Sequence, residues 1–144
     1  MNSPTEIIST LLSECRTIAV VGLSTKSNRP SYGVAQYLQA HGYRIIPVNP
    51  TYAGNDILGE HCYATLIEAA AALTTDNVKI DLVDCFRKSD AIGPIADEAI
   101  VIGARFLWMQ VGVINEEAAV KARAAGLVVV MDRCIKIDHA CLSR

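Results

Sequence analysis

The chain has 144 residues, of which 51% are apolar and 19% are charged, and its formal net charge is −2. This composition excludes a disordered chain and predicts one α/β domain over residues 1–144, with a sheet buried on both faces. The charge provides no basic face, so we expect no nucleic-acid partner.

The sequence shows no segment typical of export or of membrane insertion. It begins MNSPTE, without the basic and apolar pattern of a signal peptide, and its apolar runs are far shorter than the roughly 20 residues of a membrane span. The five cysteines form no C-x-x-C pair, which disfavours a disulfide framework and a zinc site. We therefore expect a cytoplasmic location, no membrane contact and no metal.

The first elements predicted are a helix and a buried strand. Ser3, Pro4 and Glu6 fit the cap, the first turn and the capping box of a helix, which we expect to pack at the sheet edge. Residues 17–22 read TIAVVG, a continuous apolar run typical of a strand covered on both faces. A polar connection over residues 23–30 follows.

A second helix and a second strand come next. Ser31 is expected to cap a helix that ends near Ala40, because Gly42 stops it. The strand is predicted over residues 43–49. Pro47 places it at an edge or at a bulge, because proline has no N–H to donate to a neighbouring strand.

Further strands and helices alternate along the rest of the chain. Residues 51–63 predict a loop, and Thr65 with Glu68 predicts the capping box of a helix that ends at residue 73. Asn115 is expected to cap a later helix. The remaining predicted strands are 80–86, 105–110 and 127–131, and the remaining helices are 89–103 and 116–125. Residues 133–144 have no clear pattern.

This alternation predicts an α/β fold, a Rossmann-like doubly wound parallel sheet of about five strands in a single domain. We expect the strand order 3-2-1-4-5, with the topological switch between strands one and four. Ligands bind such sheets outside the carboxyl ends of the strands, near the switch. The segments expected there are 22–31, 49–52, 84–88, 110–115 and 132–134.

The connection after the first strand departs from a nicotinamide dinucleotide site. Of the glycines in G-x-G-x-x-G only Gly22 is present, and Asn49-Pro50 stands where an acidic residue usually holds the adenosine ribose. The connection precedes a helix amino terminus, whose free N–H groups attract anions. It is rich in hydroxyl and cationic side chains: Ser24, Thr25, Lys26, Ser27, Arg29 and Ser31.

Six blocks of sequence carry a more specific resemblance. They read IAVVGLS, RPSYGV, YRIIPVNP, DLVDCFR, WMQVG and AAGLVVVMDRC. Together, in this order, they resemble the single-domain coenzyme A-binding proteins, which are similar to the CoA-binding domain of the succinyl-CoA synthetase α subunit. The resemblance covers about residues 17–139. It implies a Rossmann-like domain that binds CoA, or an acyl-CoA, through its ADP portion.

Carried over position by position, the resemblance implies a cofactor site. The first loop and segment 29–32 would hold phosphates, and segment 48–50 would line the nucleotide site together with Phe86 and Arg87. Within that site we expect Phe86 to pack on adenine and Arg87 to contact a phosphate. We also expect Gln110 and Gly112 to face the pantetheine arm. With Lys26 added from the loop, the expected site residues are Gly22, Leu23, Ser24, Lys26, Arg29, Pro30, Ser31, Tyr32, Val48, Asn49, Pro50, Phe86, Arg87 and Gln110.

We expect binding without catalysis. The synthetase continues into a second domain with a phosphorylated histidine, whereas His41, His61 and His139 lie outside any glycine-rich phosphohistidine pattern. Ligase chemistry is therefore not expected. Asp84 and Asp132 both end strands, but without a nearby histidine we do not expect them to form an acid–base pair.

Cys134 follows the last strand at the ligand end of the sheet. A thiol there could form a mixed disulfide with CoA or respond to redox state, although packing beneath the loop is the expected role. Cys85, Trp108 and Met109 are expected in the core.

Two other functions stay open from the sequence alone. One is an NAD(P)-dependent oxidoreductase. The other is an interaction module without a ligand, which would bind another chain or a second copy of itself.

Overall fold

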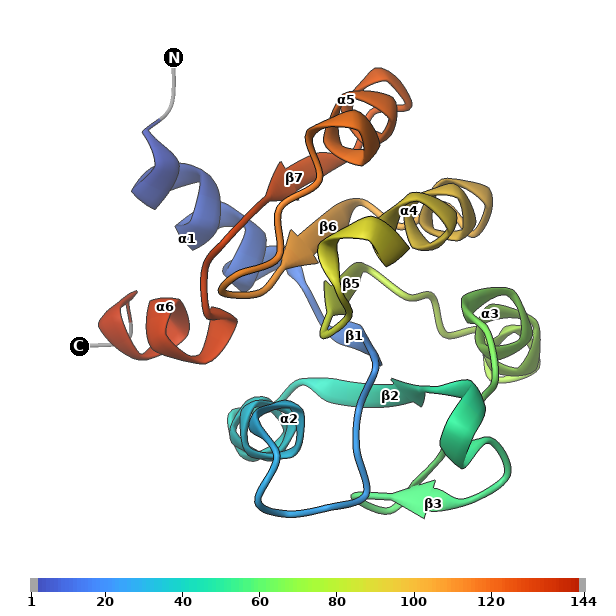
Figure 1. Ribbon diagram of the computed structural model, residues 1–144. Coiled ribbons are helices and arrows are strands. Elements are labelled where there is room, and N and C mark those ends of the chain that lie inside the picture. The colour runs from blue at the N-terminus through green and yellow to red at the C-terminus, as the bar shows by residue number, and fades with distance from the viewer. Residues whose placement is uncertain (1–2, 143–144) are drawn as a thin grey trace.

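This computed structural model describes residues 3–142. At its centre is a parallel sheet of five strands (Figure 1). The ends of the predicted domain, residues 1–2 and 143–144, lie outside the described residues. The order is β2-β1-β5-β6-β7. The strands are β1 (Thr17–Val21), β2 (Arg44–Val48), β5 (Leu82–Cys85), β6 (Phe106–Met109) and β7 (Val128–Val130). The predicted Rossmann-like fold class is confirmed.

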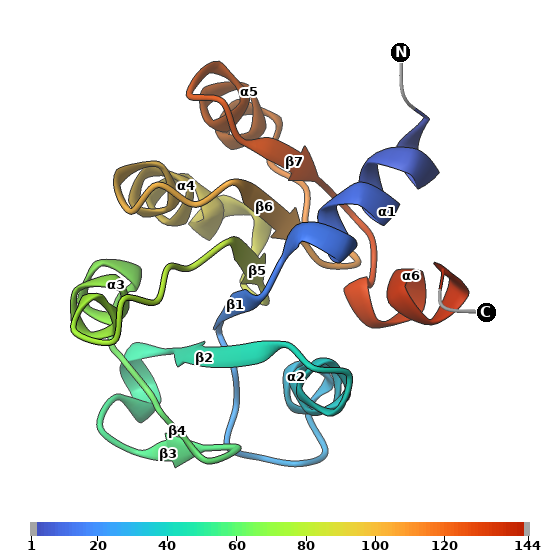
Figure 2. The same cartoon turned by 180° about the vertical axis from the view of Figure 1, so that it is seen from behind.

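Helices cover both faces of the sheet (Figures 1 and 2). One face carries α1 (Pro4–Glu14), α2 (Pro30–Ala40) and α6 (Ile135–Leu142). The other carries α3 (Leu66–Thr74), α4 (Ile92–Val101) and α5 (Glu116–Ala124). Each face has its own cluster of buried apolar side chains, because successive residues of a strand point to opposite faces. Within the described residues, no helix is both long enough and apolar enough to cross a bilayer.

Helices α1, α3 and α5 begin at the cap residues that the sequence predicted. Ser3, Thr65 and Asn115 are the cap residues of α1, α3 and α5, and each side chain accepts a hydrogen bond from a backbone N–H of the first turn. The predicted loop at 51–63 contains short elements, namely a 3₁₀ helix η1 (Pro50–Tyr52) and the two strands β3 (Asp56–Ile57) and β4 (Glu60–His61). A second 3₁₀ helix, η2 (Ser89–Ala91), precedes α4. The last segment, which had no clear pattern, forms α6.

The predicted capping of α2 by Ser31 is wrong. Arg29 is the cap residue, and Pro30 occupies the first turn, where its lack of an N–H costs nothing. The Ser31 hydroxyl turns back toward the preceding loop and accepts a hydrogen bond from the Ser24 N–H at 3.1 Å. It therefore stabilises the loop instead of the helix.

The predicted strand order is wrong in the position of the third strand. β5 pairs with β1, where Leu82 lies opposite Ile18, and so the topological switch lies between β1 and β5. β2 is an edge strand, as Pro47 predicted. Its outer side is already used, because the Pro47 carbonyl accepts the Tyr63 N–H at 3.1 Å and proline offers no N–H there. A full third strand cannot pair at that edge.

Helix α1 lies over a face of the sheet and not at its edge, which corrects the prediction. Its buried side chains Ile8, Leu11 and Leu12 join the apolar cluster beneath α2 and α6. Burying three large aliphatic side chains needs a surface of matching size, and a sheet edge does not provide one.

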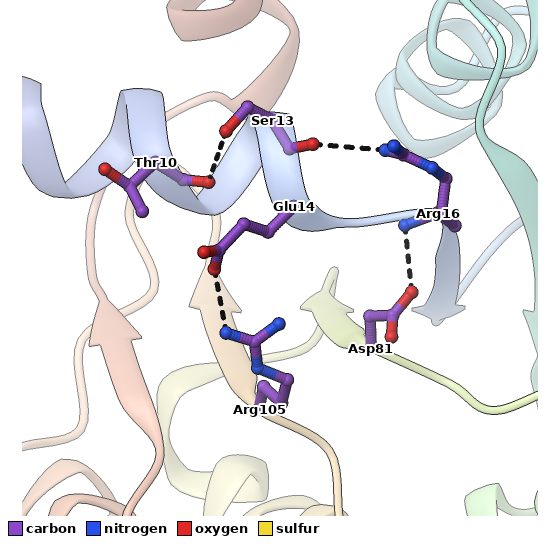
Figure 3. A network of polar contacts seen from close by, with 6 residues as sticks. All are labelled: Thr10, Ser13, Glu14, Arg16, Asp81 and Arg105. Atoms are coloured by element: carbon purple, nitrogen blue, oxygen red, sulfur yellow. Dashed lines mark hydrogen bonds and ion pairs between the residues drawn. The ribbon is translucent and has the colours of Figure 1, made fainter.

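A polar network joins α1 to the amino ends of the central strands (Figure 3). The Asp81 carboxylate accepts the Arg16 N–H at 2.8 Å and the Thr17 N–H at 3.0 Å, which fixes where the chain enters β1. Glu14 and Arg105 form an ion pair at 2.7 Å, but both are about half exposed, so this pair contributes only about 0–1 kcal/mol. The network lies at the end of the sheet opposite the predicted ligand site.

The carboxyl group of Asp84 lies inside the core. It stands on β5 between Val20 of β1 and Trp108 of β6, and neither of its oxygens has a hydrogen-bond partner within residues 3–142. Burial raises the pKa of this carboxyl well above its usual value, because the ionised form would lose its hydration. Asp84 therefore keeps its proton at pH values where a surface aspartate is charged.

Replacing Asp84 by asparagine should remove a pH dependence of stability. In the unfolded chain Asp84 ionises near pH 4, whereas in the folded chain it does so at higher pH. Between these two pKa values the free energy of unfolding falls by about 1.4 kcal/mol for each unit of rising pH. Denaturant unfolding from pH 4 to pH 8 measures the slope, and Asp56→Asn, at an exposed position, is the matched control. An Asp84→Asn protein with the wild-type slope would contradict the raised pKa.

Candidate functional site

The carboxyl ends of β1, β2 and β5 surround an open cavity of about 340 Å³, here called the central cavity. It lies at the topological switch, where crossovers leave toward opposite faces and ligands of such folds bind. Its walls come from the loops that follow these three strands and from the start of α2. The lining residues are Gly22, Ser24, Arg29, Pro30, Ser31, Asn49, Thr51, Tyr52, Phe86 and Arg87.

Gly22 allows the backbones of two loops to meet beside the cavity. Its φ is +91°, and a Cβ on it would stand 2.2 Å from the Phe86 carbonyl oxygen. The Gly22 N–H donates to the Val48 carbonyl at 2.8 Å, and the Phe86 N–H donates to the Val21 carbonyl at 2.8 Å. A side chain at Gly22 would therefore separate the ends of β1 and β5, so glycine is required both by conformation and by space.

The Asn49 side chain links the loops that follow β1, β2 and β5. Its side-chain Nδ2 donates to the Leu23 carbonyl at 3.1 Å, and its Oδ1 accepts the Thr51 N–H at 3.0 Å. The Arg87 Nη2 lies 3.5 Å from the same Oδ1. This last contact is long for a hydrogen bond, so Asn49 orients the guanidinium without fully occupying it.

Hydroxyl groups line the first loop. The Ser24 Oγ accepts the Lys26 N–H at 3.0 Å, which shapes the turn. Hydrogen bonding to the side chain of Ser24, and then to that of Thr25, lowers the pKa of the Tyr52 phenol. The phenol thus belongs to the polar wall of the cavity.

The central cavity favours an anion. Arg29 and Arg87 line it, and α2 begins at its wall, so the partial positive charge of a helix amino terminus adds to theirs. Within the described part of the chain, none of the lining residues is Asp or Glu. A phosphate or diphosphate group is the anion that such a set of guanidinium, hydroxyl and backbone donors fits.

A second hollow of about 610 Å³ adjoins the first, and we call it the apolar groove. It shares Pro30, Phe86 and Arg87 with the central cavity, so the two hollows border each other at these residues. Its other walls come from α2, the residues after β5 and β6, and the start of α6: Val34, Lys88, Gln110, Val111, Val113, Cys134 and Ile137.

A third hollow of about 300 Å³, the rear pocket, opens between α3 and α4 on the other side of the sheet. Arg87 lines this pocket as well as the central cavity and the apolar groove. One guanidinium therefore stands where the three hollows meet. The rear pocket is lined by Val21, Val48, Pro50, Ala64, Thr65, Leu66, Arg87, Ala91, Ile95 and Glu98.

The structure brings most of the predicted site residues to these hollows. Gln110 lies in the apolar groove and Val48 and Pro50 in the rear pocket. Around the central cavity are Gly22, Ser24, Arg29, Pro30, Ser31, Asn49, Phe86 and Arg87.

The remaining predicted residues line none of the three hollows. Leu23 is buried in the core, Lys26 is exposed, and Tyr32 packs against the cluster beneath α2. Thr51 and Tyr52 also line the central cavity. The sequence placed them in segment 49–52 at the ligand end of the sheet but did not name them as site residues. Their signal was position, because they directly follow Asn49-Pro50 at the carboxyl end of β2.

Two further polar candidates, Asp84 and Asp132, are not among the lining residues of the three hollows. Asp84 lies in the core, whereas Asp132 is exposed and its Oδ1 accepts the Gly112 N–H at 2.7 Å. Cys85, Trp108 and Met109 are fully buried, as predicted.

Comparison with known protein families gives a match that covers most of the chain. Residues 16–140 match the family model described as CoA binding domain. The chain belongs to the CoA-binding domain family. The family assignment predicted from the sequence blocks is thus confirmed.

Similar proteins are known from several organisms. The Bacillus subtilis protein YneT is 38% identical over 141 residues, which cover 97% of this chain and 98% of YneT. A protein from Pyrococcus horikoshii OT3 has a solved structure with 35% identity and a TM-score of 0.88, covering 99% of this chain and 94% of its own. The Thermus thermophilus protein cell-free ID.343 has 31% identity and a TM-score of 0.85, covering 99% of both chains.

Replacing Gly22 by alanine should destabilise this CoA-binding domain. The left-handed backbone alone costs about 1–2 kcal/mol for a residue with a side chain, and displacement of the Phe86 carbonyl adds to it. Gly93→Ala is the matched control, because Gly93 is helical and a Cβ there meets nothing within 4 Å. The control should gain up to about 1 kcal/mol. Denaturant unfolding compares them, and equal effects would contradict the close approach at Gly22.

Replacing Asn49 by alanine should cost about 1–3 kcal/mol of folding free energy. The change leaves the Leu23 carbonyl without its donor in a buried place. Asn55→Ala, at an exposed position, is expected to stay within about 0.5 kcal/mol of wild type. Urea unfolding of the two variants measures the difference, and a stable Asn49→Ala protein would show that the loops hold together by other contacts.

Proposed function

We propose that this protein binds coenzyme A, or a thioester of it, along the three neighbouring hollows and that it does not catalyse a reaction of its own. The observation that carries the proposal is the position of Arg87, which lines a polar cavity, an apolar groove and a smaller pocket at once. A ligand with a flat base, a diphosphate and a long arm has the three parts that such a site requires. Membership of the CoA-binding domain family supports the same ligand.

The diphosphate is assigned to the central cavity. Arg29, Arg87 and the start of α2 supply positive charge there, and Ser24, Ser31 and Tyr52 supply hydroxyl groups. Charged donors bind phosphate oxygens about twice as strongly as neutral donors do. At the start of α2, Pro30 has no N–H, and the Tyr32 and Gly33 N–H groups donate to the Arg29 carbonyl. The helix amino terminus therefore favours the anion mainly through its partial positive charge.

The adenine ring is assigned to the rear pocket. Val48 and Pro50, which the sequence placed at the nucleotide, line this pocket with apolar surface. Glu98 adds a carboxylate acceptor, although its Oε1 already accepts the Ile67 N–H at 3.2 Å. Phe86 lines the central cavity and the groove but not this pocket, so in our proposal it contacts the pantetheine arm instead of adenine.

The pantetheine arm is assigned to the apolar groove, where it would pass Phe86 and Gln110.

Absence of catalysis is the second part of the proposal. Within the described residues, the linings of the three hollows include no histidine, and their one carboxylate, Glu98, lies in the rear pocket, away from the thiol end of the ligand. An acid–base pair near the thiol is therefore not provided.

Replacing Arg87 by alanine should weaken CoA binding about 10- to 150-fold. A charge-assisted hydrogen bond to phosphate contributes about 1.5–3 kcal/mol, which corresponds to this range. Isothermal titration calorimetry measures the dissociation constants. Arg123→Ala, an exposed arginine on α5, is the matched control and should bind as the wild type does.

The same titrations decide the function. Absence of heat with CoA at high micromolar concentration would contradict a CoA-binding role. NADH that binds as tightly as CoA and competes with it would favour a dinucleotide-dependent enzyme. Native mass spectrometry of freshly purified protein gives an independent answer, because the mass of a retained ligand identifies it.

A further inference from the structure

We propose that the preferred ligand carries an uncharged aliphatic acyl group on its thiol and that this acyl group lies in the apolar groove. The inference rests on the proposed function and names the class of CoA ester that the site selects. Three features of the groove carry it: its position beside the central cavity, its apolar outer wall and the placement of its polar groups.

The position of the groove beside the central cavity gives it its direction. Pro30 and Phe86 line both hollows, so in our proposal a chain that leaves a diphosphate in the central cavity passes these two residues and enters the groove. The groove is the larger of the two, about 610 Å³ against about 340 Å³. Its size suits the arm of the ligand together with a group attached to it, because binding pockets for whole small molecules span about 300–1,000 Å³.

The outer wall of the groove is apolar and exposed to water. Val111 and Ile137 have 66% and 59% of their surface exposed, although both are large aliphatic residues. Val34 and Val113 continue the same surface inward. Covering such surface with methylene groups is favourable in proportion to the area removed from water, whereas amide or carboxylate groups gain nothing from it.

The polar groups of the groove do not call for a charged acyl group. The Gln110 Oε1 accepts the Ile135 N–H at 3.3 Å, so this oxygen is used to hold α6 against the end of β6. The cations are Arg87, which is shared with the central cavity, and the exposed Lys88 that follows it. The far walls, from Val111 to Ile137, offer no charge among the described lining residues. A dicarboxylic acyl group would bring its free carboxylate to an apolar wall and lose hydration there.

The test compares free CoA with acetyl-, butyryl-, hexanoyl- and succinyl-CoA by calorimetric titration. Each methylene that enters the groove should tighten binding about 2- to 4-fold, until the groove is filled. Butyryl-CoA and succinyl-CoA have the same number of acyl carbons, so they isolate the effect of charge. Butyryl-CoA should bind at least about 5-fold more tightly than succinyl-CoA.

Two variants test whether the acyl group lies in the apolar groove. The double substitution Val111→Ser with Ile137→Ser should reduce the hexanoyl-to-acetyl affinity ratio at least about 3-fold. Val120→Ser is the matched control, because Val120 is an equally exposed valine (64%) on α5, away from the groove. It should keep the wild-type ratio.

Failure of this inference differs from failure of the proposed function. If CoA binds but affinity does not rise with acyl length, or succinyl-CoA binds as well as butyryl-CoA, the acyl assignment is overturned and CoA binding stands. If neither CoA nor any ester binds, both fall. If length dependence persists unchanged in the double variant, the acyl chain lies elsewhere and the assignment to the groove is wrong.

Discussion

The close approach of the Gly22 and Phe86 backbones is the constraint on which the site depends. At this point the ends of β1 and β5 come together, and β2 is tied to them through the Val48 carbonyl. Because no side chain separates these backbones, Arg87, the next residue, is brought to the junction of the three hollows. Asn49 then sets the direction of its guanidinium. Glycine at one position thus determines where the main cation of the site stands.

The sequence allowed the elements and their layers to be predicted, because these depend on local patterns. Continuous apolar runs marked the strands, and Ser3, Thr65 and Asn115 marked helix starts. The strand order was not predicted, because pairing joins segments far apart in the chain. Pro47 correctly indicated that β2 is an edge strand. No local pattern showed that Tyr63 would occupy the outer side of β2, or that β5 would pair with β1.

Much of the candidate site followed from position at the carboxyl ends of strands, together with the resemblance in sequence. What neither could supply was the direction of individual side chains. Leu23 is adjacent to Gly22 yet points into the core, and Val48 faces the rear pocket while its neighbour Asn49 faces the central cavity. Tyr52 was expected at the ligand end of the sheet but was not named as a site residue, because its role depends on contact with Ser24, which lies in a loop distant in sequence. These are properties of the assembled backbone.

The placement of β5 beside β1 also determines the order in which the site is completed during synthesis. β1 is made first, but one of its two edges stays unpaired until Leu82–Cys85 has been made, and Phe86 and Arg87 come only after that. Cys134 and helix α6 with Ile137, which line the groove, are made after all five strands of the sheet. Contacts between such distant segments form late in folding. A ligand of the three hollows can therefore stabilise the finished domain by binding to it, but it has no complete site on the growing chain.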